Sequence, residues 1–167
     1  MLGLPDNLGK IEGNVTGWPA SLDVKSEKAK LLIAKDYVNI VCDEDISKID
    51  GIRRNPLLAR QIIKSYARNL CTLAKKTNML KDMIAESESI TMVTFDDYVS
   101  ALEKLFVIED IEAWNPSIRS ATAIRSGKKR CFVDQSIVVA KLEISQQLLE
   151  LNLKTFGFIF ECMVLRN

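Results

Sequence analysis

Apolar residues recur at steps of three and four along four stretches of the chain, a period that predicts helices with one buried face. These stretches cover about residues 27–43, 55–71, 73–84 and 94–105. Three of them begin with a capping signal: Ser26, the pair Asn55-Pro56, and Thr94 with Asp97 three residues later. The first two thirds of the chain are therefore expected to be mainly helical.

The apolar pattern changes period after the helix that starts at Thr94. Residues 106–108 form a short apolar run followed by acidic residues, and residues 130–133 form a second run, as expected for two short strands. Turn signals at Asn115-Pro116 and Ser126-Gly127 delimit a basic loop between them. Together with a brief extended piece at residues 90–93, this order of elements is typical of a winged helix. The predicted fold class is mainly α with a small β wing (α+β), a winged-helix-like three-helix module flanked by additional helices.

The end of the chain predicts further helices and an interaction surface. Asp134 and Ser145 are placed to cap two more helices. Residues 155–167 are the most apolar stretch, too short to span a membrane and interrupted by Glu161, so we predict a buried helix. Because nothing else in the sequence is evidently left to cover it, we expect a neighbouring domain or a second copy of the chain to do so. The surface would consist of Phe156, Phe158, Ile159, Phe160, Met163 and Val164.

These patterns divide the chain into four predicted parts. Residues 1–22 are rich in Gly, Pro and Asn and read as a leader or linker, and residues 23–54 as a linking helix. Residues 55–134 form the winged-helix-like domain. Residues 135–167 form the helical start of a truncated C-terminal domain.

The composition narrows the classes of function. The 167 residues are 47% hydrophobic, enough for the core of one or two small domains, and the net charge of +1 favours no particular partner. The absence of histidine excludes Ser-His and Cys-His dyads and imidazole metal ligands. The four cysteines, at positions 42, 71, 131 and 162, form no C-x-x-C pair, so we predict free buried thiols and no metal site. Because no signal-peptide pattern is visible, we expect a cytoplasmic protein.

An acidic run, Asp43-Glu44-Asp45, stands near the end of the first predicted helix, where the helix dipole disfavours acids. Two alternatives stay open. In the first, the run is simply a solvated surface. In the second, the unfavourable position is relieved, either because the helix stops there or because the acids meet a cation such as Arg53 or Arg54. A calcium loop is not indicated, because Asp43, Asp45 and Asp50 lack its spacing and its glycine.

Several segments carry a family resemblance. They are DGIRRNP (50–56), RN (68–69), YVSALEKLFVIED (98–110) with AWNP (113–116), KRCFVD (129–134) and TFGFIFE (155–161). In this order they resemble the predicted bacterial and archaeal AAA+ superfamily ATPases that carry a restriction-endonuclease-like C-terminal domain of unknown function. The likeness runs from about Gly17 to the end, and residues 77–93 depart from the family pattern by being longer and less regular.

The resemblance implies that this chain is a middle piece of such a protein. A P-loop ATPase domain, which binds ATP and Mg²⁺, would precede it, and the nuclease-like domain would follow. Gly127-Lys128-Lys129 is not a P-loop, because it lacks the earlier glycine and the final Ser or Thr. Glu161 lies where such nuclease folds hold a glutamate, but alone it catalyses nothing. We therefore expect no enzymatic activity and no cofactor here, and a structural or interaction role between the two missing domains.

The alternative function is nucleic-acid binding through the basic loop. Five cations and no acid lie between residues 119 and 130, and such cations contact phosphates. They are Arg119, Arg125, Lys128, Lys129 and Arg130. The helix that would read the groove carries Asp96, Asp97 and Glu103 against Lys104. Because carboxylates repel phosphates, we expect no sequence-specific reading, and only non-specific contact stays open.

Overall fold

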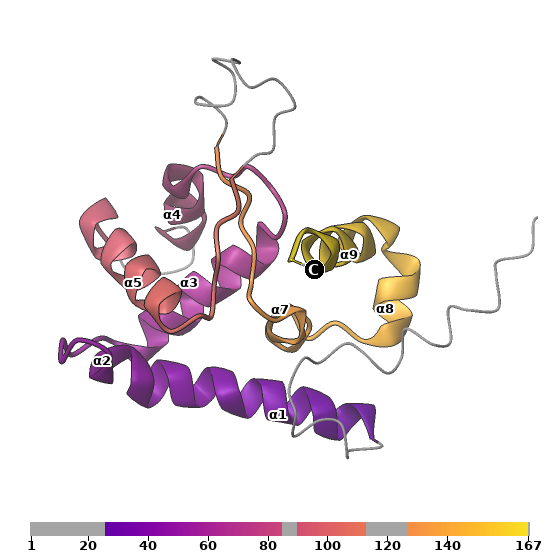
Figure 1. Cartoon of the computed structure of the whole chain (residues 1–167), viewed down its shortest axis with the longest axis horizontal. Coiled ribbons are helices and arrows are strands. Elements are labelled where there is room, and N and C mark those ends of the chain that lie inside the picture. The colour runs from indigo at the N-terminus through magenta and orange to yellow at the C-terminus, as the bar shows by residue number, and fades with distance from the viewer. Residues whose placement is uncertain (1–25, 85–89, 113–126, 167) are drawn as a thin grey trace, which may run out of the picture.

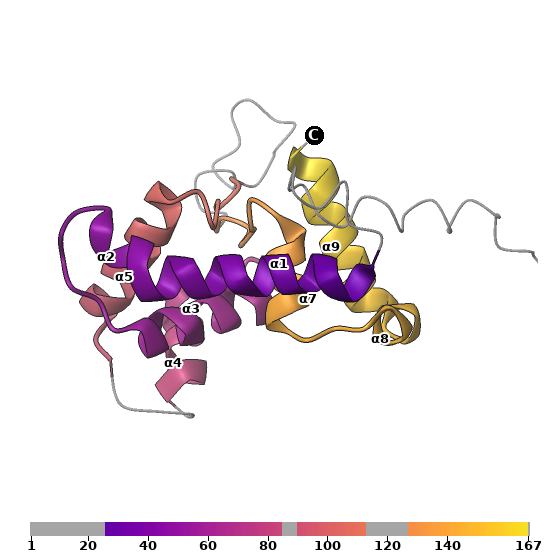
Figure 2. The same ribbon diagram turned by 90° about the horizontal axis from the view of Figure 1, so that it is seen from below.

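The first described helix, α1, runs along much of the length of the molecule (Figure 1, Figure 2). The computed structural model describes residues 26–84, 90–112 and 127–166, so the leader predicted for residues 1–22 and the Asn115-Pro116 turn lie outside the described residues. Helix α1 spans Glu27–Ile40, with Ser26 at the N-cap position but without a hydrogen bond to its side chain. The start of the helix is as predicted, whereas the capping contact is not formed.

The backbone stays helical beyond the predicted end of this first helix. It passes into a π-helical turn, η3 (Val41–Asp45), and then into the short helix α2 (Ile46–Lys48). Val41, Cys42 and Ile46 are all buried in the core, which holds this wider turn in place.

Two acids of this turn pair with cations, which was one of the alternatives left open by the sequence. The carboxylate of Asp43 lies 2.6 Å from the guanidinium of Arg60, and that of Glu44 lies 2.5 Å from the ammonium of Lys48. The cations suggested by sequence proximity, Arg53 and Arg54, are not the partners of Asp43 and Glu44, and Arg54 binds Asp50 and Asp97 instead. Arg60 comes from the next long helix, so only the tertiary packing brings it to Asp43.

Three helices follow, and they lie together at the left of Figure 1. They are α3 (Pro56–Arg68), α4 (Lys76–Ile84) and α5 (Met92–Lys104). Asn55 caps the first as predicted, since its side chain accepts a hydrogen bond from the N–H of Leu57 at 2.9 Å. Helix α5 begins one turn earlier than predicted: the N-cap is Thr91, whose hydroxyl accepts from the N–H of Thr94 at 3.2 Å. Residues 90–93, expected to be extended, therefore lie partly inside the helix, because Thr91 offers the same capping group.

The two predicted wing strands do not form as strands within the described residues. The two segments meet in two isolated antiparallel bridges, Ile108 with Phe132 and Ile111 with Lys129. The N–H of Ile111 donates to the carbonyl of Lys129 at 2.9 Å, and the reverse bond measures 2.7 Å. The predicted β wing is thus corrected to a pair of short irregular segments.

A third segment pairs with the other side of the second one. The N–H of Cys71 donates to the carbonyl of Arg130 at 2.8 Å, and the N–H of Arg130 donates to the carbonyl of Thr72 at 3.1 Å. The backbone is left-handed at Cys71 (φ 56°) and at Phe106 (φ 54°), next to the paired residues. Because left-handed residues interrupt an extended chain, no regular ladder develops.

Helix α7 (Gln135–Lys141) lies at the centre of the packing and contacts α1, α3 and the last helix. Its first six residues are all buried. One cluster of buried side chains includes residues from the predicted parts 23–54, 55–134 and 135–167, so these parts share a core. Within it Tyr66 meets Phe132 edge-on, with ring centroids 6.3 Å apart.

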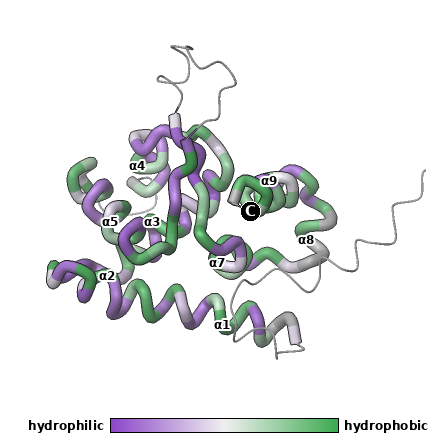
Figure 3. Tube along the Cα trace, viewed as in Figure 1, coloured by the Kyte–Doolittle hydropathy of each residue, from purple (hydrophilic) through white to green (hydrophobic). Residues whose placement is uncertain are grey.

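The chain then turns into its last two helices. They are α8 (Gln146–Leu151) and α9 (Leu153–Arg166). The predicted caps are confirmed: Asp134 accepts from the N–H of Ser136 at 2.7 Å, and Ser145 accepts from the N–H of Leu148 at 3.2 Å. The tube of helix α9 is mostly green in Figure 3, which marks most of its residues as hydrophobic. Within the described ranges, no helix has the length and apolar character needed to cross a bilayer.

Candidate functional site

The cations predicted to contact nucleic acid lie only partly in the described chain. Arg119 and Arg125 fall outside it. The ammonium of Lys128 lies 3.6 Å from the carboxylate of Glu112, and both side chains are more than half exposed. Such an exposed pair contributes little to stability and leaves Lys128 accessible.

The other two cations are directed into the protein. Lys129 pairs with Glu161 of α9, and Arg130 pairs with Asp110. The Nε of Arg130 also donates to the carbonyl of Ala74 at 3.0 Å, and its side chain is only 9% exposed. These charges therefore hold neighbouring segments together and face protein carboxylates.

Asp110 is a buried carboxylate with an incomplete set of partners. Its Oδ2 contacts Arg130 and lies 3.5 Å from the hydroxyl of Tyr66, whereas no protein group bonds to its Oδ1. Burial raises the pKa of Asp110, and Arg130 opposes that shift. Burial likewise raises the pKa of Tyr66. The Asp110 side chain is 5% exposed, so this carboxylate is largely closed off from solvent.

Of the apolar residues predicted to form a surface on α9, some are buried in the core and others are exposed. Ile159 is buried and belongs to the core, and Phe158 and Met163 are partly buried against that core. Phe160 and Val164 are 52% and 58% exposed. Only part of the predicted surface is therefore available to a partner.

A stripe of apolar residues faces outward on α9. Leu153, Phe156, Phe160 and Val164 follow one another at steps of three, four and four, which places them on one helix face. Leu153 is 75% exposed, and the rings of Phe156 and Phe160 stack with centroids 6.4 Å apart. We call these four residues the outer α9 stripe. Leu153 was missed in the sequence, although the same periodicity would have found it.

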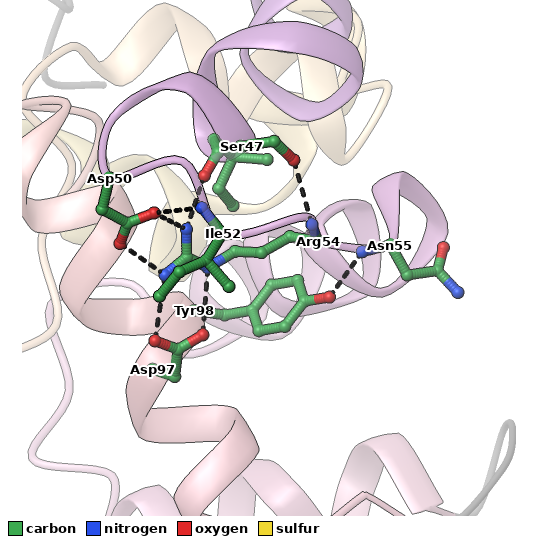
Figure 4. A network of polar contacts seen from close by, with 8 residues as sticks. Ser47, Asp50, Ile52, Arg54, Asn55, Asp97 and Tyr98 are labelled. Carbon is green, nitrogen blue, oxygen red and sulfur yellow. Dashed lines mark hydrogen bonds and ion pairs between the residues drawn. The ribbon is translucent and has the colours of Figure 1, made fainter.

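A buried polar network centres on Arg54 (Figure 4). Its guanidinium binds the carboxylates of Asp50 and Asp97 through four hydrogen bonds of 2.7–3.0 Å, and donates to the carbonyl of Ile46 at 2.7 Å. All five of its donors are thus used. The guanidinium also lies 5.9 Å from the ring centroid of Tyr98. Asp97, predicted to help cap its helix, instead connects α5 to the turn before α3.

Arg54 controls the ionisation of this network. Its hydrogen bonds lower the pKa of Asp50 to about 2. The two carboxylates in turn raise the pKa of Arg54. Because no donor of the guanidinium is left for a ligand, the network has a structural role.

Three of the four cysteines come together on one side of the core. The Sγ atoms of Cys71, Cys131 and Cys162 all lie within 4.8 Å of one another, and the three residues are buried. The Sγ atoms of Cys131 and Cys162 are 2.8 Å apart. The fourth, Cys42, is also buried but lies outside this group. Burial of the thiols is as predicted, whereas their convergence was invisible in the sequence, because they are far apart along the chain.

Comparison with known proteins gives a family but no activity. The profile of a family described as a domain of unknown function (DUF8612) matches residues 14–148, which is most of the chain. Neither the curated proteins nor the solved structures contain a match. The matched region includes the Arg54 network and ends before α9.

Proposed function

We propose that this chain, which belongs to the DUF8612 family, is a non-catalytic interaction module of a AAA+ type ATPase. It would join the ATPase domain to a C-terminal domain and dock a protein surface on the outer α9 stripe. The uncovered stripe is the observation that carries the docking role. The ATPase context rests on the sequence resemblance of segments such as residues 98–110.

The arrangement of residues 55–134 supports a winged-helix-like scaffold. Helices α3, α4 and α5 follow in order, and residues 107–111 and 129–133 pair after the third helix. Residues 71–72, between the first two helices, bond to the other side of the second segment. The fold alone does not imply nucleic-acid binding.

Phosphate binding through the basic loop is less well supported. Lys129 and Arg130 already face carboxylates, as described above. On α5, Asp96 is exposed and lies 2.8 Å from the ammonium of Lys76. The carboxylate of Asp97 is itself 42% exposed. These carboxylates would repel a phosphate backbone at the helix that should enter the groove.

A second copy of the chain is the occupant that we propose for the stripe. In a two-fold symmetric pair the same patch lies on both sides of the contact. Leu153, Phe160 and Val164 are each at least half exposed, so such a pair would bury six large side chains. Only about half to three quarters of each side chain is left to bury, so at about 1.5–3 kcal/mol for a whole side chain the gain is about 5–11 kcal/mol. Association costs about 4–15 kcal/mol, so a dimer is energetically accessible.

Sedimentation velocity over a range of protein concentrations tests the docking role. We expect the wild type to associate and Phe160→Asp to stay monomeric, because a carboxylate cannot enter a dry interface without a large cost. Val93→Asp is the matched control: Val93 is 80% exposed but lies on α5. A wild type that stays monomeric at every concentration, or equal association of both variants, would overturn self-docking.

The ATPase context has its own test. The coding sequence upstream of this segment should contain a P-loop of the form G-x-x-x-x-G-K-[ST]. An upstream region without one would overturn the ATPase assignment and leave the docking result unaffected. ATP hydrolysis by the purified chain would contradict the non-catalytic role.

A further inference from the structure

We propose that Cys71, Cys131 and Cys162 form a binding site for Zn²⁺, with Glu161 as the fourth ligand. The three cysteines come from the loop after α3, from the segment before α7 and from α9. Their Sγ atoms lie within 4.8 Å of one another. This site is separate from the outer α9 stripe and does not depend on the proposed function.

The geometry of the thiols suits a tetrahedral ion. A Zn–S bond measures about 2.3 Å, so two sulfurs of a tetrahedral site lie about 3.8 Å apart. The three Sγ–Sγ distances are all at most 4.8 Å, a range that contains the distance of about 3.8 Å expected for a zinc site. Cys131 and Cys162, at 2.8 Å, would move apart by about 1 Å to take up the bond length of a zinc site. All three residues are at most 4% exposed, as in closed structural sites.

The backbone holds two of the ligands together without any metal. The N–H of Cys71 bonds to the carbonyl of Arg130 at 2.8 Å, directly before Cys131. The carbonyl of Cys131 accepts from the N–H of Glu109 at 3.0 Å. Cys71 is left-handed (φ 56°), a conformation that costs a non-glycine residue about 1–3 kcal/mol. Glycine would be less strained at position 71. The need for a thiol that binds a metal would explain why a cysteine stands there.

Glu161 is the candidate for the fourth ligand. It precedes Cys162 on α9, and it contributes to the raised pKa of Cys71. Its carboxylate is not among the groups that lie within 4.8 Å of one another, so it would move toward the ion on binding. Its side chain is 43% exposed, so an ion can enter beside it. Three thiolates and one carboxylate give the loaded site a net charge of about −2, and Lys129, paired with Glu161, offsets part of it.

Two of the three thiols, those of Cys71 and Cys162, have a raised pKa and are protonated when no metal is bound. Burial raises the pKa of Cys71 to about 11, and the contact with Cys131 raises that of Cys162. The same contact lowers the pKa of Cys131. Metal binding would therefore release protons, as at other thiolate sites.

A disulfide between Cys131 and Cys162 is the competing outcome. Such a bond would be about 2.05 Å long, against the observed 2.8 Å. It would use two sulfurs and leave the position of Cys71 without a role. A metal ion uses all three sulfurs, and for this reason we favour it.

Metal content tests the site. The reduced chain is mixed with one equivalent of Zn²⁺, excess ion is removed, and bound zinc is measured by elemental mass spectrometry. We expect one ion per chain for the wild type. For Cys162→Ser and Glu161→Gln we expect binding weaker by at least about tenfold, the loss seen when even a supporting group of a metal site is removed. Co²⁺ in place of Zn²⁺ should give sulfur-to-metal absorption in the wild type.

Cys42→Ser is the matched control, because Cys42 is as buried as the three ligands but stands apart from them. It should bind zinc like the wild type, and circular dichroism checks that each variant is folded. If Cys162→Ser fails to fold, the Co²⁺ spectrum of the wild type decides. A wild type that retains no zinc and shows no Co²⁺–thiolate absorption would overturn the proposal. A Cys131–Cys162 disulfide in the metal-treated chain, or full retention in a folded Cys162→Ser variant, would overturn it as well.

Discussion

Replacement of Arg54 by alanine is expected to destabilise the protein by about 3 kcal/mol. The Arg54 side chain is 2% exposed and binds Asp50, Asp97 and the carbonyl of Ile46. Removing one partner of a buried ion pair costs about 3–5 kcal/mol, because the remaining charge is left without compensation. The Asp50 and Asp97 side chains are 23% and 42% exposed, so water can solvate them after the change. This relief places the expected loss at the lower end of the range.

Urea unfolding followed by far-UV circular dichroism measures this loss. The free energy of unfolding is extrapolated linearly to zero urea, and the slope should not change, because the variant buries nearly the same surface. Arg53→Ala is the matched control: it removes the neighbouring guanidinium, which belongs to an exposed residue. We expect that variant to stay within about 0.5 kcal/mol of the wild type.

Equal stability of the Arg54→Ala and Arg53→Ala variants would refute the reasoning, since it would mean that the network in Figure 4 contributes no more than a solvated charge. Asp97→Asn gives a graded check. It keeps one hydrogen-bonding oxygen, and its partner Arg54 retains Asp50. The expected loss is therefore smaller, about 1 kcal/mol.

Three further predictions concern other polar contacts. Asp134→Ala should lose at least about 1 kcal/mol in urea unfolding, because it removes the cap of α7, whereas Ser26→Ala, which removes no capping bond, should change little. The free energy of unfolding should fall in acid because of Asp50. The stabilising contribution of its carboxylate is complete above its ordinary pKa of 3.8 and is lost as the pH falls toward about 2. An Asp50→Asn variant should lack this step. Arg130→Ala should cost about 3–5 kcal/mol in urea unfolding, and a second change, Asp110→Asn, should restore part of the loss, because it removes the uncompensated buried charge. If the double variant is no more stable than Arg130→Ala, the buried pair is not the cause.

The elements that could be predicted from the sequence are those whose signals are local. Asn55, Asp134 and Ser145 each cap a helix as expected, because a cap involves only residues within one turn. The early start of α5 shows the limit of such signals. Thr91 and Thr94 carry the same hydroxyl three residues apart, and only the packed structure selects the first.

The prediction of a β wing was wrong for a different reason. The apolar run at residues 106–108 has the composition of a strand, but the left-handed backbone at Phe106 ends the extended conformation there. Residues 71–72 pair with the other side of Arg130, a contact between segments that are far apart in the chain. Neither fact is encoded in the local pattern.

The sequence by itself determined the mainly helical fold, the starts of several helices and the burial of the thiols, because these follow from periodicity, capping groups and side-chain type. The tertiary structure alone decided which charges and which sulfurs meet. Asp97 lies 43 positions after Arg54, and Cys162 lies 31 after Cys131. Contacts over such separations depend on how helices pack, and no spacing rule along the chain reports them.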